Sequence, residues 1–127
     1  MTRSQQLLAR ALGDVQSVPA SDHKTYGSLC HRLPALVRRN GLCQTLAFLN
    51  AKKDTKGNDA HELLLQHLAT QLGVARGDVL TSVGTAPLPL YMQQTRTVLS
   101  ALIYYKRFAV SILHVDSTDE DETVVTR

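Results

Sequence analysis

Helical periodicity runs through most of this 127-residue sequence and restricts its fold more than any other feature. In the first segment, apolar residues recur at the i, i+3, i+4, i+7 spacing that places them on one face of an α-helix. They are Leu8, Ala11, Leu12, Val15 and Val18. No segment has a convincing strand pattern, and the chain is therefore predicted to be all-α.

A second amphipathic helix is predicted from Asp22, a candidate N-cap residue, to Asn40 and Gly41, which are typical of a helix end. Pro34 lies inside this helix and predicts a kink. The next segment, from Leu42 to Lys53, is apolar on nearly every side, as expected for a helix in the middle of a bundle.

Two further helices complete the expected fold. Asn58 or Asp59 is expected to begin a helix that Gly73 ends, and residues 88–113 are expected to form a last helix about 39 Å long. We therefore predict a compact bundle of five to six helices with a long C-terminal helix, forming one domain over residues 1–113. Residues 114–127 hold five acidic residues and are expected to form a disordered tail.

Charge is distributed unevenly along the chain. The net charge is +3, but residues 1–113 carry 13 Lys and Arg against 6 Asp and Glu, a net charge of +7. Such a basic body favours a polyanionic partner such as nucleic acid. The alternative is that the charge serves only to keep a small protein in solution.

The two cysteines give no sign of metal or redox chemistry. Cys30 and Cys43 form no CxxC motif and no zinc-binding spacing with histidine, and are interpreted as small core residues in a reducing compartment. The longest apolar run, residues 98–105, is too short to span a bilayer. We therefore expect a soluble, cytoplasmic protein that needs no metal or other cofactor and has no membrane partner.

Basic pairs at or near helix ends are the candidate binding residues. They are Arg38 and Arg39, Lys52 and Lys53, and Lys106 and Arg107. Cations at helix C-termini offset the macrodipole and need no ligand for that role. With His31 and Arg32, the same cations could instead line a track for a phosphate backbone. Tyr104 and Tyr105 are interpreted as core or rim residues rather than as platforms for stacked bases.

Two blocks of the sequence combine residues in a recognisable order. The first block comprises Tyr26, Leu33-Pro34, Asn40-Gly41-Leu42, the run QTLAFL at 44–49, and Lys52. The second block is Tyr105-Lys106-Arg107-Phe108-Ala109, and the last helix also opens with Tyr91 followed by Thr95. Together these blocks resemble the small helical subunit of the type III-B CRISPR effector, the Cmr complex, and the resemblance covers roughly residues 26–109.

This resemblance implies a non-catalytic subunit that acts in antiviral defence. It would stack along the filament that carries the CRISPR RNA (crRNA) and line the groove where target RNA pairs with the guide. The implied partners are other Cmr subunits, crRNA and target RNA, and further copies of the same chain. Lys52 and Lys106 occupy motif positions and Arg107 stands beside them. Charge and position add Arg38, Arg39 and Lys53.

Three other functions are compatible with parts of the sequence. The run RRNGLCQTLAFL could be a helix-turn-helix, but its second helix offers few polar side chains to read bases. A hydrolase or metalloenzyme would need better geometry, because a helix points the adjacent Cys30 and His31 about 100° apart. His61 and His67, six residues apart, lie on different helix faces. An adaptor that binds only other proteins remains the main alternative.

Overall fold

The computed structural model describes residues 2–52 and 59–115, and these residues contain six α-helices, two short 3-10 helices and no strand. The elements are α1 (Arg3–Gln16), η1 (Ala20–Asp22), α2 (His23–Asn40), α3 (Leu42–Lys52), α4 (Asp59–Leu72), η2 (Arg76–Asp78), α5 (Val79–Gly84) and α6 (Leu88–Ser111). The prediction of an all-α fold with a long C-terminal helix is confirmed.

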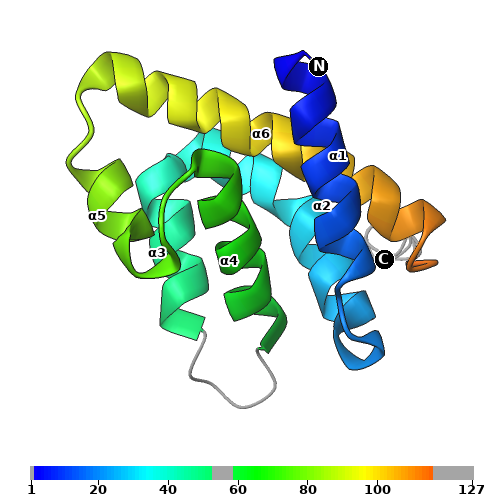
Figure 1. Ribbon diagram of the computed structural model, residues 1–127. Coiled ribbons are helices and arrows are strands. Elements are labelled where there is room, and N and C mark those ends of the chain that lie inside the picture. The colour runs from blue at the N-terminus through cyan, green and yellow to red at the C-terminus, as the bar shows by residue number, and fades with distance from the viewer. Residues whose placement is uncertain (1, 53–58, 116–127) are drawn as a thin grey trace.

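Helix α6 lies across one side of the bundle and packs on α1, α2 and α4 (Figure 1). Helices α3 and α4 lie side by side below it, and α5 packs on α3. Gly41 at the end of α2 faces Tyr91 near the start of α6, whereas Gly27 near the start of α2 faces Val115 just beyond α6. Helices α2 and α6 therefore run antiparallel along a shared contact.

Local sequence explains how several helices begin and end. Thr2 and Gln5 form a capping box at the start of α1, with backbone-to-side-chain hydrogen bonds of 2.8 and 3.1 Å. Gly41 and Gly73 follow α2 and α4 with φ values of 90° and 74°. Residues with a side chain rarely adopt this backbone region, so glycine allows the chain to turn at these two points.

Some predicted helix limits differ from the observed ones. Asp22 precedes α2 as expected, but its side chain makes no capping hydrogen bond, because η1 already leads the backbone into the helix. Helix α1 ends at Gln16, before Val18, and α6 ends at Ser111, before Leu113. Helix α2 continues through Pro34. The tail expected to be disordered spans residues 114–127, but its first two residues are described, and Val115 packs against the core. Residues 116–127 lie outside the described residues.

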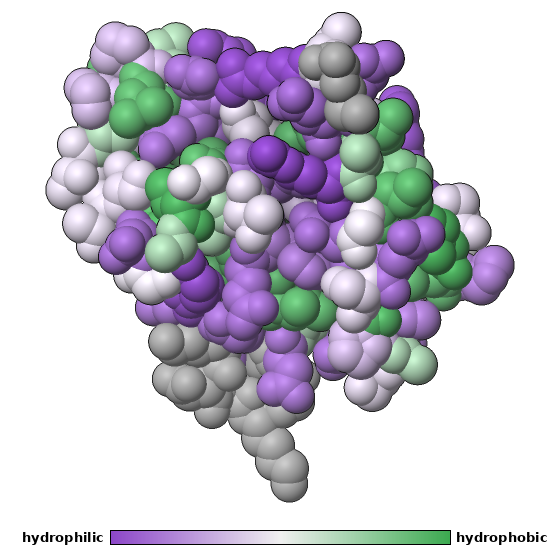
Figure 2. Space-filling model, in the orientation of Figure 1, coloured by the Kyte–Doolittle hydropathy of each residue, from purple (hydrophilic) through white to green (hydrophobic). Residues whose placement is uncertain are grey.

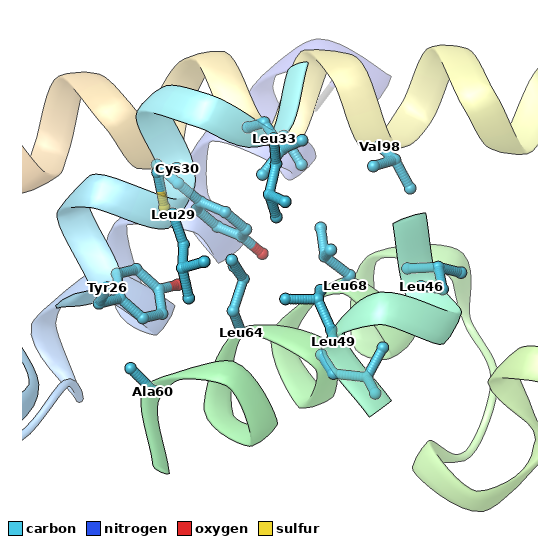
Figure 3. Packing of buried hydrophobic residues seen from close by; sticks show 14 of the residues in the cluster. Tyr26, Leu29, Cys30, Leu33, Leu46, Leu49, Ala60, Leu64, Leu68 and Val98 are labelled. Carbon is cyan, nitrogen blue, oxygen red and sulfur yellow. The ribbon is translucent and has the colours of Figure 1, made fainter. Parts of the chain in front are cut away.

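The core lies where α2, α3, α4 and α6 meet. Leu33 of α2, Leu46 of α3, Leu68 of α4 and Val98 of α6 point toward one another (Figure 3). All four side chains are at most 1% exposed. Burying a side chain of this kind stabilises the folded chain by about 1.5–3 kcal/mol. The amphipathic faces seen in the sequence therefore meet in one cluster.

Helix α3 differs from the prediction of a helix buried on nearly every side. Its buried residues are Leu42, Thr45, Leu46 and Leu49. Ala47 and Ala51 are exposed on its outer surface. Alanine counts as apolar, but its single methyl group gives little drive for burial. The apolar content of the segment therefore overstated how central the helix is.

A buried polar network joins four helices. The Tyr105 hydroxyl of α6 donates a hydrogen bond to Asp14 Oδ2 of α1 at 2.7 Å, and the Tyr26 hydroxyl of α2 lies 2.7 Å from His67 Nδ1 of α4. Burial, together with the Asp14 carboxylate, raises the pKa of Tyr105. Burial lowers the pKa of His67, and Asp14 partly opposes that shift. Tyr105 is thus a core residue, as predicted.

Candidate nucleic-acid interface

A groove of about 660 Å³ is lined by α2 and the second half of α6, which pack against each other. Arg38 reaches it from α2, and Lys106 and Arg107 reach it from α6. Arg38 and Arg107 are exposed, whereas Lys106 is half-buried. The structure therefore brings together three of the cations that the sequence marked as candidates, although Arg38 lies far from Lys106 and Arg107 along the chain.

Helical spacing explains why these side chains share one groove. On α2, His31, Pro34, Ala35 and Arg38 follow the i, i+3, i+4, i+7 pattern. On α6, Ile103, Lys106, Arg107 and Val110 follow the same pattern. Each set therefore occupies one face of its helix, and the antiparallel packing of the two helices places the faces side by side.

The groove has apolar walls and is lined by the charged ends of basic side chains. Pro34, Ala35, Ile103 and Val110 form walls against which the aliphatic parts of long basic side chains can lie, while the charged ends stay in water. Among the described residues, no Asp or Glu lines this groove. Its electrostatic field is therefore positive and suits an anion that can remain partly hydrated.

The remaining predicted site residues lie elsewhere. Arg39 is exposed in the last turn of α2 but does not line the groove. Lys52 is exposed at the last position of α3, about 15 Å along the helix axis from its first residue. Lys53 lies outside the described residues. The predicted set is thus divided between one groove and separate positions on the surface.

Sequence reasoning missed the apolar walls of the groove. Ile103 and Val110 remain 42% and 40% exposed. Val110 lines the groove together with Arg107 rather than lying in the core. A usable signal was present, because these two residues share one helical face with Lys106 and Arg107.

The geometry gives little support to a nucleophilic cysteine, a metal site or a helix that reads DNA bases. Cys30 is completely buried, and burial raises the pKa of its thiol, which disfavours a nucleophilic thiolate. Within the described part of the chain, no group of three or more His, Cys, Asp or Glu residues could hold a metal ion. Helix α3 exposes Ala47 and Ala51 where a recognition helix would need polar side chains.

None of the helices in residues 2–52 and 59–115 combines the length and apolar character needed to cross a membrane.

Comparison with known families gives a direct assignment. The family model described as CRISPR-associated protein (Cas_Cmr5) matches residues 3–112. The chain belongs to this family. The resemblance to the Cmr small subunit is thereby confirmed.

Relatives of this Cmr5 family member support the same assignment. A Thermus thermophilus protein named CRISPR system Cmr subunit Cmr5 is 34% identical over 114 residues, which cover 88% of this chain and 96% of that protein. An X-ray crystal structure of a CRISPR-associated Cmr5 family protein, also from Thermus thermophilus, matches with a TM-score of 0.75 and 34% identity. That match covers 88% of this chain and 97% of the solved chain.

Proposed function

We propose that this protein is a non-catalytic subunit of a Cmr-type CRISPR effector complex and that it holds RNA through contacts to the phosphate backbone. Membership of the Cmr5 family supports the assignment to a complex, because the Thermus thermophilus relative is named as a Cmr subunit. The proposed partners are other Cmr subunits, crRNA and target RNA.

The convergence of Arg38, Lys106 and Arg107 on one groove carries the proposal of RNA binding. Cations that stay near solvent avoid the large cost of burying an unpaired charge and can release counterions from a nucleic acid. Contacts of this kind position a strand without reading its bases. Sequence recognition is then left to pairing between guide and target, as in other RNA-guided effectors.

Arg39, Lys52 and Lys53 are proposed as flanking contacts. Arg39 follows Arg38 directly, so a strand that leaves the groove at this end passes close to it. Lys52 is at the far end of α3 from Gly41 and the end of α2 (Figure 1). A strand that reaches Lys52 therefore has to leave the groove and follow α3, which makes this contact more peripheral.

Charge reversal in a reconstituted complex tests the proposal. We expect Arg107→Glu to weaken binding of single-stranded target RNA and to reduce the slope of log K against log salt by at least about 0.7, the value for one lost phosphate contact. Lys24→Glu makes the same change of charge at an exposed residue that does not line the groove. We expect this control to retain nearly all of the affinity and the slope.

A protein-only adaptor is the alternative, and one observation favours it. Leu88, Leu90 and Met92 at the start of α6 are 69%, 43% and 49% exposed, which suits a contact with another subunit. An adaptor predicts that Leu88→Ser with Leu90→Ser abolishes assembly, while Arg107→Glu leaves the RNA affinity of assembled complexes unchanged. The second result would refute RNA binding by the groove.

A further inference from the structure

A second hollow, of about 400 Å³, lies between α1 and α6, and it contains no residue of the predicted binding set. Arg3 and Arg10 reach it from α1, and Arg96 reaches it from α6. Both helices present residues at the i, i+3, i+4, i+7 spacing, which gives each helix one lining face. Figure 2 shows hydrophilic residues gathered along the upper edge of the molecule, where α6 passes the N-terminal end of α1.

The hollow has an unbalanced positive charge. No acidic residue of the described chain lines it. The ion pair found within residues 2–52 and 59–115 is that of Arg76 with Glu62, and it does not involve any of the three arginines. Guanidinium groups that line one hollow without counter-charges repel one another, so an anion bound among them would lower the electrostatic energy.

Hydrogen bonds hold Arg3 in place at the rim. Its Nη2 donates to Thr97 Oγ1 at 3.4 Å. When the Gln93 amide is oriented with its oxygen toward Arg3, this oxygen also accepts from Nη1 and Nη2 at 3.2 and 3.0 Å. A guanidinium that is already oriented loses less conformational freedom when it binds a ligand.

Gln71 adds a buried amide to the lining of the hollow. It lines the hollow from α4 and is 7% exposed. The amide lies near the Tyr105 hydroxyl and partly opposes the burial that raises the pKa of Tyr105, but within the described residues neither Nε2 nor Oε1 has a hydrogen-bond partner of good geometry. A buried amide in this state is unusual, and a ligand oxygen that accepted from Nε2 would satisfy its donor.

We propose that this hollow binds a phosphate group through Arg3, Arg10, Arg96 and the Gln71 amide. Phosphate offers several acceptor oxygens and more than one negative charge, and arginine can pair with two of those oxygens at once. The phosphate belongs either to an RNA backbone or to a free nucleotide or diphosphate. Arg96 and Arg107 lie on the same side of α6, about 16 Å apart along its axis, so one strand could reach both sites.

The first experiment measures binding of inorganic pyrophosphate to the full-length protein by calorimetry at low ionic strength. We expect Arg96→Gln and Arg10→Gln each to weaken binding about tenfold, as the loss of one charge-assisted contact implies. Lys24→Gln removes one positive charge outside the hollow and should leave binding unchanged. Two separate arginine variants keep the test valid if one of them fails to fold, which circular dichroism would reveal.

The second experiment measures binding of a short single-stranded RNA to the same variants across a salt series. If Arg96→Gln lowers both affinities, the site accepts phosphate from either source. A loss for pyrophosphate alone assigns the site to free phosphates, and a loss for RNA alone assigns it to a backbone. If neither affinity changes, the proposal is wrong.

These outcomes are independent of the α2/α6 groove. Lys106→Gln with Arg107→Gln should weaken RNA binding without altering pyrophosphate binding, because neither residue lines the α1/α6 hollow. Failure of RNA binding at the groove would therefore leave the pyrophosphate result interpretable.

Discussion

Gly41 joins α2 to α3 with φ 90° and ψ 159°, a backbone region in which only glycine is common. A Cβ at this position would also stand 3.1 Å from the Tyr91 hydroxyl, which accepts a hydrogen bond from the Cys43 amide. We expect Gly41→Ala to lower the free energy of unfolding by about 1–3 kcal/mol. Urea denaturation would measure this change, with Gly13→Ala as the control.

Gly13, in contrast to Gly41, lies where alanine should stabilise the protein. It lies within α1, has a negative φ, and a Cβ there would meet no atom within 4 Å. Alanine at a helix-interior position is favoured over glycine by about 0.5–1 kcal/mol, so Gly13→Ala should stabilise the protein. Equal effects of the two substitutions would contradict the backbone argument.

His67 makes stability depend on pH. Burial lowers its pKa below the ordinary value of 6.5, so the unfolded chain binds a proton more readily than the folded chain does. This histidine therefore favours the folded state fully above pH 6.5, and its contribution falls as the pH drops from 6.5 toward the folded pKa, by at most about 1.4 kcal/mol per pH unit. Urea midpoints of the native protein and of His67→Gln at pH 7.5 and 5.5 would reveal the effect.

The variant His67→Gln should be less stable than the native protein at pH 7.5, because Tyr26 loses its imidazole partner at 2.7 Å. It should also lose less stability between the two pH values. His114→Gln alters an exposed histidine and serves as the control. If the pH dependence of stability is unchanged in the His67 variant, other titratable groups cause it.

At the scale of elements, the short helices η2 and α5 are held by polar contacts of Arg76 with Glu62 and Asn50, here called the polar clamp. A helix of six residues is not stable alone in water. Arg76 of η2 donates to both carboxylate oxygens of Glu62 on α4 at 2.7 and 2.8 Å, and to Asn50 of α3 at 2.9 Å. Both charged side chains are about one quarter exposed, so solvent screens the pair only partly.

We expect a double-mutant cycle of Arg76→Ala and Glu62→Ala to give a coupling energy of about 1 kcal/mol. Hydrogen exchange should also accelerate in residues 76–84 of the Arg76 variant, because the clamp holds them to α3 and α4. Additive effects of the two substitutions would mean that the pair does not restrain these helices.

The packing of the helices explains which features of the fold the sequence could predict. Helices α1, α2, α4 and α6 follow from local spacing, because each amphipathic stripe encodes its own buried face. The α2/α6 groove does not follow from local spacing, because it depends on how two helices far apart in the chain pack together. Arg38 was thus a candidate on charge and position, whereas its closeness to Lys106 could be seen only in the folded structure. Arg96 had no charged neighbour in sequence to mark it.

At the scale of the whole molecule, the sign of the charge changes near the C-terminal end of the chain. Changing Asp116, Asp119, Glu120, Asp121 and Glu122 to their amides would raise the net charge from +3 to +8 because five negative charges are lost. A more positive molecule attracts RNA over longer range, so we expect affinity for single-stranded RNA to rise at least about threefold at 0.05 M salt. The gain should shrink near 0.5 M salt, where the screening length is only about 4 Å.

Filter binding at both salt concentrations would measure the gain in affinity, with Ser117→Ala and Thr118→Ala as the uncharged control. Equal affinities at low salt would mean that the acidic segment does not oppose the field of the basic body.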